Sequence, residues 1–239
     1  MKYLDVTLGT PAANLAVEDH LLEAADRGEA GEALRIWRPE QPFVVVGYAN
    51  SVATEVDRPA CQAGGIPVLR RISGGGTVVQ GPGVLCYAVI LEVERRPELA
   101  TIPGTNAYVL DRVMAALQPL VEGRIERQGD TDLVLAGRKF AGNAQRRKRR
   151  TVLFHGSLLL QADLTMIGRL LRHPTREPVY RAGRAHGEFL RNLNLDPGRV
   201  AAALRSTWGA SEPLPALDLA AVQSLAIDRY ESAEWNARF

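Results

Sequence analysis

The sequence has no long hydrophobic run and almost no cysteine. Its longest apolar stretch, about Val84–Leu91, is far shorter than the ~20 residues that cross a bilayer, so no membrane partner is expected. The N-terminus has acidic residues where a signal peptide would need an apolar segment. Cys61 and Cys86 form no CxxC pair, which favours free thiols in a reducing compartment. These absences together predict a cytoplasmic protein.

Zinc-binding and nucleic-acid-binding patterns are also missing. The four histidines, His20, His155, His173 and His186, form no HExxH pair or other zinc spacing. The formal net charge is only +2, which is too small to imply a nucleic-acid partner. The basic run Arg146–Arg150 is more typical of a solvated turn, although it also suits contact with an acidic protein partner.

Lysine is scarce, since the 29 basic residues include only Lys2, Lys139 and Lys148. Arginine is therefore the ordinary cation of this chain. A lysine inside a motif is therefore more often a functional residue. Its ammonium is a compact charge that can lose its proton, whereas a guanidinium is broad and keeps its proton.

Helical and strand-like patterns follow one another without regular βαβ alternation. The predicted helices are Asn14–Arg27, Glu55–Ala63, Asn106–Leu117, Asp163–Leu171, Asp196–Trp208 and Asp218–Tyr230. The predicted strands are Leu34–Trp37, Phe43–Gly47, Pro67–Ile72, Val84–Leu91, Thr151–Leu160 and two strands within Asp132–Gln145 joined at Ala136–Gly137. This order favours an α+β fold with a mixed, mainly antiparallel sheet flanked by helices, formed as one domain over residues 1–239.

The first informative motif is RRISGGGTVVQGPG, at Arg70–Gly83. Three consecutive glycines after a strand let backbone amides approach an anion closely, and the preceding Arg70 and Arg71 add charge-assisted donors for phosphate. The motif is not a Walker A loop, because Pro82 stands where lysine is needed, and not a dinucleotide fingerprint, because Val79 stands where glycine is needed. By itself it fits a phosphate cradle and a flexible turn about equally.

The second motif is GRKFAGNAQ, at Gly137–Gln145. Lys139 is followed by the mostly small residues Ala141–Ala144, which leave space for a ligand, and Asn143 offers both a donor and an acceptor. A lysine in a strand usually points to solvent, but the scarcity of lysine and these neighbours favour a functional role.

A third motif, LFHGSLLL, contains His155 and Ser157. Their i, i+2 spacing on a strand is insufficient for a catalytic triad, and the chain has no GxSxG sequence. Nucleophilic serine catalysis is therefore disfavoured.

Taken together, these segments resemble the lipoate–protein ligase A family, within the wider group of biotin ligases and octanoyltransferases. The resemblance runs in order through Asn14–Leu22, Arg70–Gln80, Asp132–Gln145, His155–Leu160, Tyr180–Leu193 and Glu231–Phe239. The combination of RRxSGGG with GRKxxGNA is far more specific than any single glycine run.

The resemblance implies adenylation of an acyl group. The carboxylate of lipoate or octanoate would attack the α-phosphate of ATP with support from Mg²⁺, and a lysine of a lipoyl domain or glycine-cleavage H protein would then accept the acyl group. Lys139 matches the family's catalytic lysine, where it would contact both the carboxylate and the α-phosphate.

The resemblance also assigns further site residues. Arg71, Gly74, Gly75, Gly76, Thr77, Val78 and Val79 match the nucleotide-binding loop; Asp132 matches a position for Mg²⁺ or the adenine side; Asn143 and Ala144 lie beside the acyl-adenylate; and Arg70, Ser73, Gln80 and His155 are neighbours of the site.

Three departures leave an alternative open. Gln80 stands where many relatives have histidine, and Ile125–Leu133 lacks the cysteine of one octanoyltransferase branch, which disfavours that branch. The chain ends soon after its EWN segment, where longer ligases continue into an accessory domain, so a separate chain would supply that part or only the transfer step occurs. The alternative is an octanoyl or lipoyl transferase that uses acyl-carrier protein without ATP.

Two further possibilities are disfavoured. Biotin ligation is disfavoured because the sequence contains no GRGRxGR-like loop. A non-catalytic binding module would have no need to keep Arg71, Gly74–Gly76 and Lys139 together.

Overall fold

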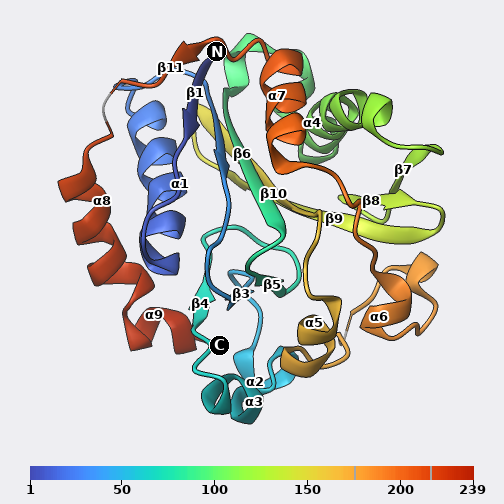
Figure 1. The fold of residues 1–239 in the computed structure, drawn as a ribbon. Helices are drawn as coiled ribbons and strands as arrows, with labels where there is room; N and C mark the ends of the chain where they lie inside the picture. Colours follow the sequence, from blue (N-terminus) through green and yellow to red (C-terminus); the bar gives the residue numbers. More distant parts are fainter. Residues whose placement is uncertain (175, 216) are drawn as a thin grey trace.

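The computed structural model describes residues 1–174, 176–215 and 217–239. Its main sheet has eight strands in the order β11-β1-β2-β6-β10-β9-β8-β7 (Figure 1). Their bounds are β1 Lys2–Asp5, β2 Ala33–Trp37, β6 Val84–Glu92, β7 Ile125–Gln128, β8 Asp132–Leu135, β9 Arg138–Arg147, β10 Thr151–Leu159 and β11 Glu212–Pro213. Strand β1 pairs in parallel with β2 and β11, and the other neighbours are antiparallel. The predicted α+β class with a mixed, mainly antiparallel sheet is confirmed.

A second, three-stranded sheet carries the glycine-rich segment. Its order is β4-β3-β5, with β3 at Phe43–Val46, β4 at Val68–Arg70 and β5 at Val78–Gln80. Strand β3 is parallel to β4 and antiparallel to β5. The sequence patterns predict β3 and β4 but miss β5, whose three residues are too few to show a period. The segment between β4 and β5 is therefore anchored at both ends on one central strand.

Helices cover both faces of the main sheet. Figure 1 shows α1 and α8 on one side of it and α4 and α7 on the other. The longer helices are α1 Pro11–Asp26, α4 Ile102–Leu117, α7 Pro197–Thr207 and α8 Leu219–Leu225, which continues as a π-helix at Ala226–Tyr230. The shorter ones are α2 Val52–Glu55, α3 Arg58–Ala63, α5 Leu164–Leu170, α6 His186–Phe189, α9 Ala233–Ala237 and four 3₁₀ turns at Val93–Arg95, Pro97–Ala100, Gln118–Leu120 and Val179–Arg181.

Strand β6 separates two hydrophobic cores because its side chains alternate between the sheet faces. Cys86, Ala88 and Ile90 join the core beneath α1, whereas Tyr87 and Val89 join the core beneath α4 and α7. Almost all of β6 is buried, as its continuous apolar sequence predicts.

Local capping explains where the predicted helices begin. The Thr10 side chain accepts a hydrogen bond from the Ala13 amide, so α1 begins at Pro11, three residues before the predicted start. The predicted helix Glu55–Ala63 is divided, because Val56 is extended and Asp57 caps the separate helix α3. This division places Glu55 at the end of α2, where it faces the glycine segment.

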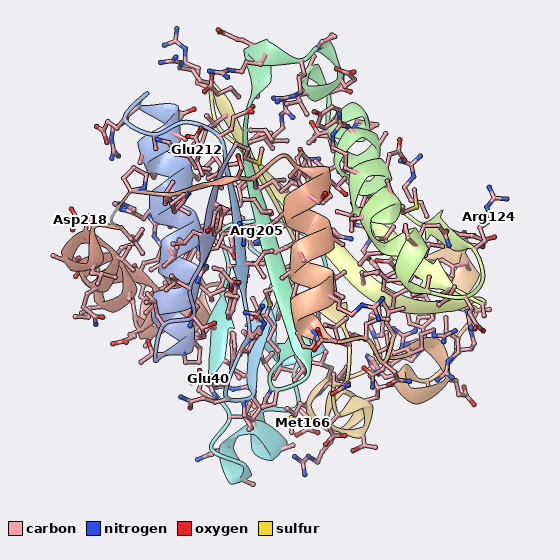
Figure 2. The ribbon with its side chains drawn as sticks, turned by 45° about the horizontal axis from the view of Figure 1, so that its top comes forward. Glu40, Arg124, Met166, Arg205, Glu212 and Asp218 are labelled. Carbon is pink, nitrogen blue, oxygen red and sulfur yellow. The ribbon has the colours of Figure 1, made fainter. Side chains whose placement is uncertain are left out.

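A stacked arginine packs α7 against β1, the second strand of the main sheet. Arg205, labelled beside α7 in Figure 2, places its guanidinium 3.6 Å from the ring centroid of Tyr3 on β1.

Within the described ranges, no helix has both the length and the hydropathy that a membrane span requires.

Candidate active site

The glycine loop, defined as Ser73–Thr77, leaves β4 and returns as β5. Gly74–Gly76 are exposed, and Gly75 has a φ of +84°, a conformation that favours glycine. The loop also needs Gly47 beneath it, because a Cβ at Gly47 would lie 2.1 Å from the Gly75 carbonyl oxygen. Sequence reasoning did not single out Gly47, since its partner is distant in the chain.

Arg71 organises the carbonyl groups of the glycine loop. Its Nη2 donates to the carbonyl oxygens of Gly74 (2.5 Å) and Gly76 (2.8 Å), and its Nε donates to Ser73 Oγ (3.0 Å). Burial lowers the pKa of the guanidinium to about 10, so it remains a cation at neutral pH. The predicted nucleotide ligand Arg71 therefore supports the loop from within.

Arg70 is fully buried, and every side-chain hydrogen bond it makes goes to a main-chain carbonyl. The acceptors are Gly47 (2.9 Å), Tyr48 (3.0 Å), Asn50 (2.7 Å), Trp235 (3.2 Å) and Asn236 (3.1 Å). Arg70, predicted as a neighbour of the site, therefore joins the segment after β3 to helix α9.

Lys139 lies on β9 and forms an ion pair with Asp132 on β8, with 2.7 Å between Nζ and Oδ1. The second carboxylate oxygen of Asp132 accepts a hydrogen bond from the Tyr180 hydroxyl at 2.7 Å. Burial and the Asp132 charge raise the pKa of Tyr180, so the hydroxyl keeps its proton. The ammonium is held by one carboxylate and is still partly exposed (side chain 23%).

A β-bulge gives Lys139 its direction. The register between β8 and β9 shifts between Leu133 and Val134, and both Phe140 and Ala141 are buried in the core beneath α4. Lys139 and Gly142 consequently face the same side although they are three residues apart. A Cβ at Gly142 would lie 3.0 Å from the lysine Nζ, so the glycine leaves room for the side chain.

The glycine loop and Lys139 meet over β9. A Cβ at Gly75 would lie 3.6 Å from the Ala144 side chain, and Lys139 covers Gly142 two residues earlier. Two strand residues span about 7 Å, so the ammonium and the loop lie on one sheet face within the reach of one small ligand. The predicted residues Lys139, Asp132, Gly75 and Ala144 are thus brought together.

Asn143 points to the opposite face and is already paired. Its Oδ1 accepts from the Tyr87 hydroxyl (2.6 Å), and its Nδ2 donates to the Thr131 carbonyl (2.6 Å). A Cβ at Gly156 would lie 1.8 Å from Asn143 Oδ1, which explains the glycine there. Asn143 shapes β9 from behind, and it is the Asn143 main chain that lies near the glycine loop.

A buried chain of polar groups connects the loop to helix α1. Ser73 Oγ lies 2.6 Å from His155 Nε2, and His155 Nδ1 lies 2.5 Å from Glu18 Oε2. Burial opposes the charge on Glu18, but contacts with His155, Arg35 and Trp37 outweigh it and lower the Glu18 pKa. The sequence predicts Ser73 and His155 as site neighbours, whereas Glu18 looks like part of an ordinary amphipathic helix.

The middle of β10, close to the glycine loop, is only partly covered. Residues His155, Gly156 and Ser157 are partly exposed in the middle of β10, although the strand is otherwise buried. Gln80 donates to Ser157 Oγ at 3.1 Å from the neighbouring β5. The side-chain amide oxygen Oε1 of Gln80 is buried and finds no hydrogen-bond partner among the described residues. This partly exposed strip of β10 lies beside β9, the strand that carries Lys139.

Glu55 holds the far end of the glycine loop. Its Oε2 accepts from the Thr77 amide (3.2 Å), from the Thr77 hydroxyl and from Asn50 Nδ2 (2.8 Å). Asn50 also donates to the Gly75 carbonyl at 3.0 Å. The next residues, Val78 and Val79, pair with β3 and pack in or against the core beneath α1. Glu55 and Asn50 have no sequence signal of their own.

Asp132 is the predicted contact for a metal ion. The described residues contain no group of three or more His, Cys, Asp or Glu side chains that could hold one. A single carboxylate such as Asp132 is compatible with Mg²⁺ that is held mainly by substrate phosphates. Its contact with Lys139 would have to rearrange for Mg²⁺ to bind.

The basic run Arg146–Arg150 is partly used inside the protein. Arg147 donates to the Leu99 carbonyl at 2.6 Å, and Lys148 pairs with Glu23 at 2.5 Å. Arg146 lies over the Tyr48 ring, with its Cζ 5.5 Å from the centroid. Only part of this run is therefore available to another protein.

Residues 10–194 match the family model described as the lipoyl protein ligase A/B catalytic domain. The chain belongs to this family. An Aeropyrum pernix protein assigned as a lipoate-protein ligase A is 34% identical over 171 residues, which cover 70% of this chain and 61% of that protein. The octanoyltransferase LipM of Anoxybacillus flavithermus is 26% identical over 274 residues, covering 98% of this chain and 97% of that protein.

Solved structures agree on the fold of this lipoyl protein ligase A/B family member. A crystal structure of lipoate-protein ligase A bound with ATP has a TM-score of 0.82 at 21% identity, covering 99% of both chains. A bi-partite lipoate protein ligase of Thermoplasma acidophilum, studied with its E2 lipoyl domain, has a TM-score of 0.80 at 21% identity, covering 99% of this chain and 95% of that one. The expected family is confirmed, and the protein is an enzyme of the lipoate ligase/octanoyltransferase class.

The surroundings of Lys139 predict an unusual histidine titration. Burial lowers the pKa of His186 to about 4, and the charges of Arg181, His173 and Lys139 add to the effect. An unfolded histidine titrates near 6.5, so between about 6.5 and 4 the unfolded state binds the extra proton. Acidification through this window is expected to cost stability in the wild type and less in His186→Gln. Urea unfolding at pH 7 and pH 4.5 measures the difference, with His20→Gln as the control, and equal losses in wild type and His186→Gln would contradict it.

Proposed function

We propose that this chain is a lipoate–protein ligase. It activates lipoate or octanoate with ATP and transfers the acyl group to a lysine of a lipoyl domain or glycine-cleavage H protein. The observation that carries the proposal is the meeting of Lys139 and the glycine loop on one face of β9. The structural relatives that were solved with bound ATP or studied with a lipoyl domain support ATP as a substrate and a lipoyl domain as the acceptor.

The first step joins the acid to the nucleotide. A carboxylate oxygen attacks the α-phosphorus of ATP, the bond to the β-phosphate breaks, and pyrophosphate leaves with the bonding electron pair. Both reactants are anions, so a cation between them lowers their repulsion and stabilises the charge on the phosphate oxygens. Lys139 supplies that charge, and Asp132 and Tyr180 hold its position.

The second step passes the acyl group to protein. The neutral amine of the acceptor lysine attacks the carbonyl carbon of the mixed anhydride, AMP leaves, and the amine loses a proton. The exposed amides of the glycine loop hold the phosphate end, and the partly exposed strip of β10 holds the acyl chain. In the first step Mg²⁺, held mainly by the phosphates, would add charge neutralisation at the leaving pyrophosphate, and Asp132 would reach it only if its contact with Lys139 rearranged.

The second candidate is acyl transfer from acyl-carrier protein without ATP, which the nearly full-length similarity to LipM octanoyltransferases favours. Neither cysteine suits a covalent version of this reaction. Cys61 and Cys86 are both buried, and burial raises the pKa of both thiols. A transferase of this kind would need direct attack of the acceptor lysine on the donor thioester.

Partner and cellular context complete the proposal. Residues 1–239 form one catalytic domain that works in the cytoplasm. A separate accessory chain assists acyl transfer, which the bi-partite Thermoplasma ligase supports by analogy. The exposed part of the Arg146–Arg150 run contacts the acidic acceptor.

Pyrophosphate release tests the proposal. The purified chain, given ATP, Mg²⁺ and lipoate or octanoate, is expected to release pyrophosphate only when the acid is present. Omission of the acid is the control for background hydrolysis. No release with either acid, together with octanoyl transfer from octanoyl-acyl-carrier protein to a lipoyl domain, would replace the ligase with the transferase.

A further inference from the structure

Four polar residues form an unbroken chain from helix α1 to the glycine loop. Glu18 contacts His155, His155 contacts Ser73, and Ser73 accepts from Arg71, with heavy-atom distances of 2.5, 2.6 and 3.0 Å. Glu18, Ser73 and Arg71 are buried, and 12% of the His155 side chain is exposed. The proposed chemistry assigns no role to Glu18.

A count of donors and acceptors favours one placement of the protons along these four residues. Ser73 Oγ already accepts the Arg71 Nε–H, so its own proton needs another acceptor, and His155 Nε2 is the one within reach. This count favours a hydrogen on His155 Nδ1, from which it would be donated to Glu18. A doubly protonated ring would leave the Ser73 hydroxyl hydrogen without an acceptor in a buried place.

This hydrogen-bonded chain of side chains ends at Arg71, which shapes the glycine loop. Arg71 draws the carbonyls of Gly74 and Gly76 toward itself. In a planar trans peptide the carbonyl and the following amide point in opposite directions, so the Gly75 N–H points away from Arg71. The Gly75 amide makes no hydrogen bond to any described residue. A correctly held Arg71 thus leaves a free donor on the exposed side of the loop.

We propose that Glu18 is a positioning residue, which acts through His155, Ser73 and Arg71 to present the Gly75 amide to a nucleotide phosphate. Only the identity of the ligand rests on the proposed function, since the hydrogen-bond chain exists without it. Ser73 is not a nucleophile in this arrangement, because it is fully buried and its oxygen accepts from a cation.

Glu18→Gln tests the role of the carboxylate. Trp37 Nε1 (2.9 Å) and Arg35 Nη1 (3.4 Å) donate to Glu18 Oε1, so the amide oxygen of the variant must stay with them. Its NH₂ group then faces His155 and forces the ring hydrogen to Nε2. We expect ¹⁵N NMR to show the Nδ1–H form in the wild type and the Nε2–H form in Glu18→Gln. We also expect shifted amide signals for Gly74–Gly76 and a Kd for ATP weakened about tenfold, the effect of one charge-assisted hydrogen bond.

Matched variants keep the test decisive. Glu23→Gln removes a carboxylate from the same helix that contacts Lys148 at the surface, and it is expected to leave all three readouts unchanged. Ser73→Ala interrupts the chain without touching the buried charge, and it should shift the same glycine signals if Glu18→Gln fails to fold.

Three results would overturn the positioning role. These are an Nε2–H ring in the wild type, unmoved glycine signals in Glu18→Gln, and unmoved glycine signals in Ser73→Ala. A wild type that binds no ATP would refute the proposed nucleotide reaction, while the ring tautomer and glycine signals would still decide the role of Glu18.

Discussion

Replacing Lys139 with alanine is expected to lower acid-dependent pyrophosphate release by about 10³-fold or more, with the protein still folded. Lys139 lies beside the glycine loop, and in the proposed reaction its ammonium stands where the two anions approach each other. Losing it removes the charge that offsets their repulsion in the transition state. The rate of pyrophosphate release at saturating ATP and lipoate or octanoate measures the loss of activity. Circular dichroism with thermal unfolding checks that the variant is folded.

Two matched variants separate the position of the charge from its presence. Lys139→Arg keeps the charge but replaces a compact ammonium with a wide planar group above Gly142, so most activity should still be lost. Lys148→Ala removes a lysine that pairs with Glu23 and should leave the rate unchanged. Activity in Lys139→Ala within tenfold of the wild type would remove Lys139 from the reaction and leave the glycine loop as a binding site only.

The long elements were predictable because their patterns are local. The apolar run Val84–Leu91 reads as a buried strand, and it is one in the structure, as β6 at Val84–Glu92. Helix starts were less exact, since Thr10 and Asp57 act as caps through single side chains. Strand β5 was missed because pairing with β3, and no pattern of its own, makes it a strand.

Part of the candidate site was predictable for chemical reasons. Lys139 stood out because the chain contains so few lysines and because small residues follow it. The groups that support the site gave no such signal. Glu18 occupies an ordinary position in a helix, and Gly47 is needed only because the Gly75 carbonyl comes to rest above it. Such roles arise from contacts between distant segments, which one sequence does not encode visibly.

Arg70→Met is expected to lower the free energy of unfolding by about 3 kcal/mol, through the loss of charge-assisted hydrogen bonds and the stranding of buried carbonyls. The guanidinium satisfies carbonyls from two segments that are more than 180 residues apart, Gly47–Asn50 and Trp235–Asn236. Methionine fills a similar volume but donates nothing. Urea unfolding followed by tryptophan fluorescence measures the loss, because Trp235 lies in the affected contact.

The control for Arg70 is Arg199→Met, which removes an exposed arginine on α7 and should change stability little. A second expectation concerns the loop, because Arg70 directly precedes Arg71 and its amide is held by Asn236 Oδ1 at 2.8 Å. Loosening this anchor should also weaken ATP binding in protein that is still folded. A stable Arg70→Met with weak ATP binding would instead assign Arg70 to the nucleotide, whereas an unstable variant with normal binding would limit it to joining α9 to the sheet. Loss of both is expected, since the same carbonyl contacts hold the C-terminal helix and the start of the glycine loop.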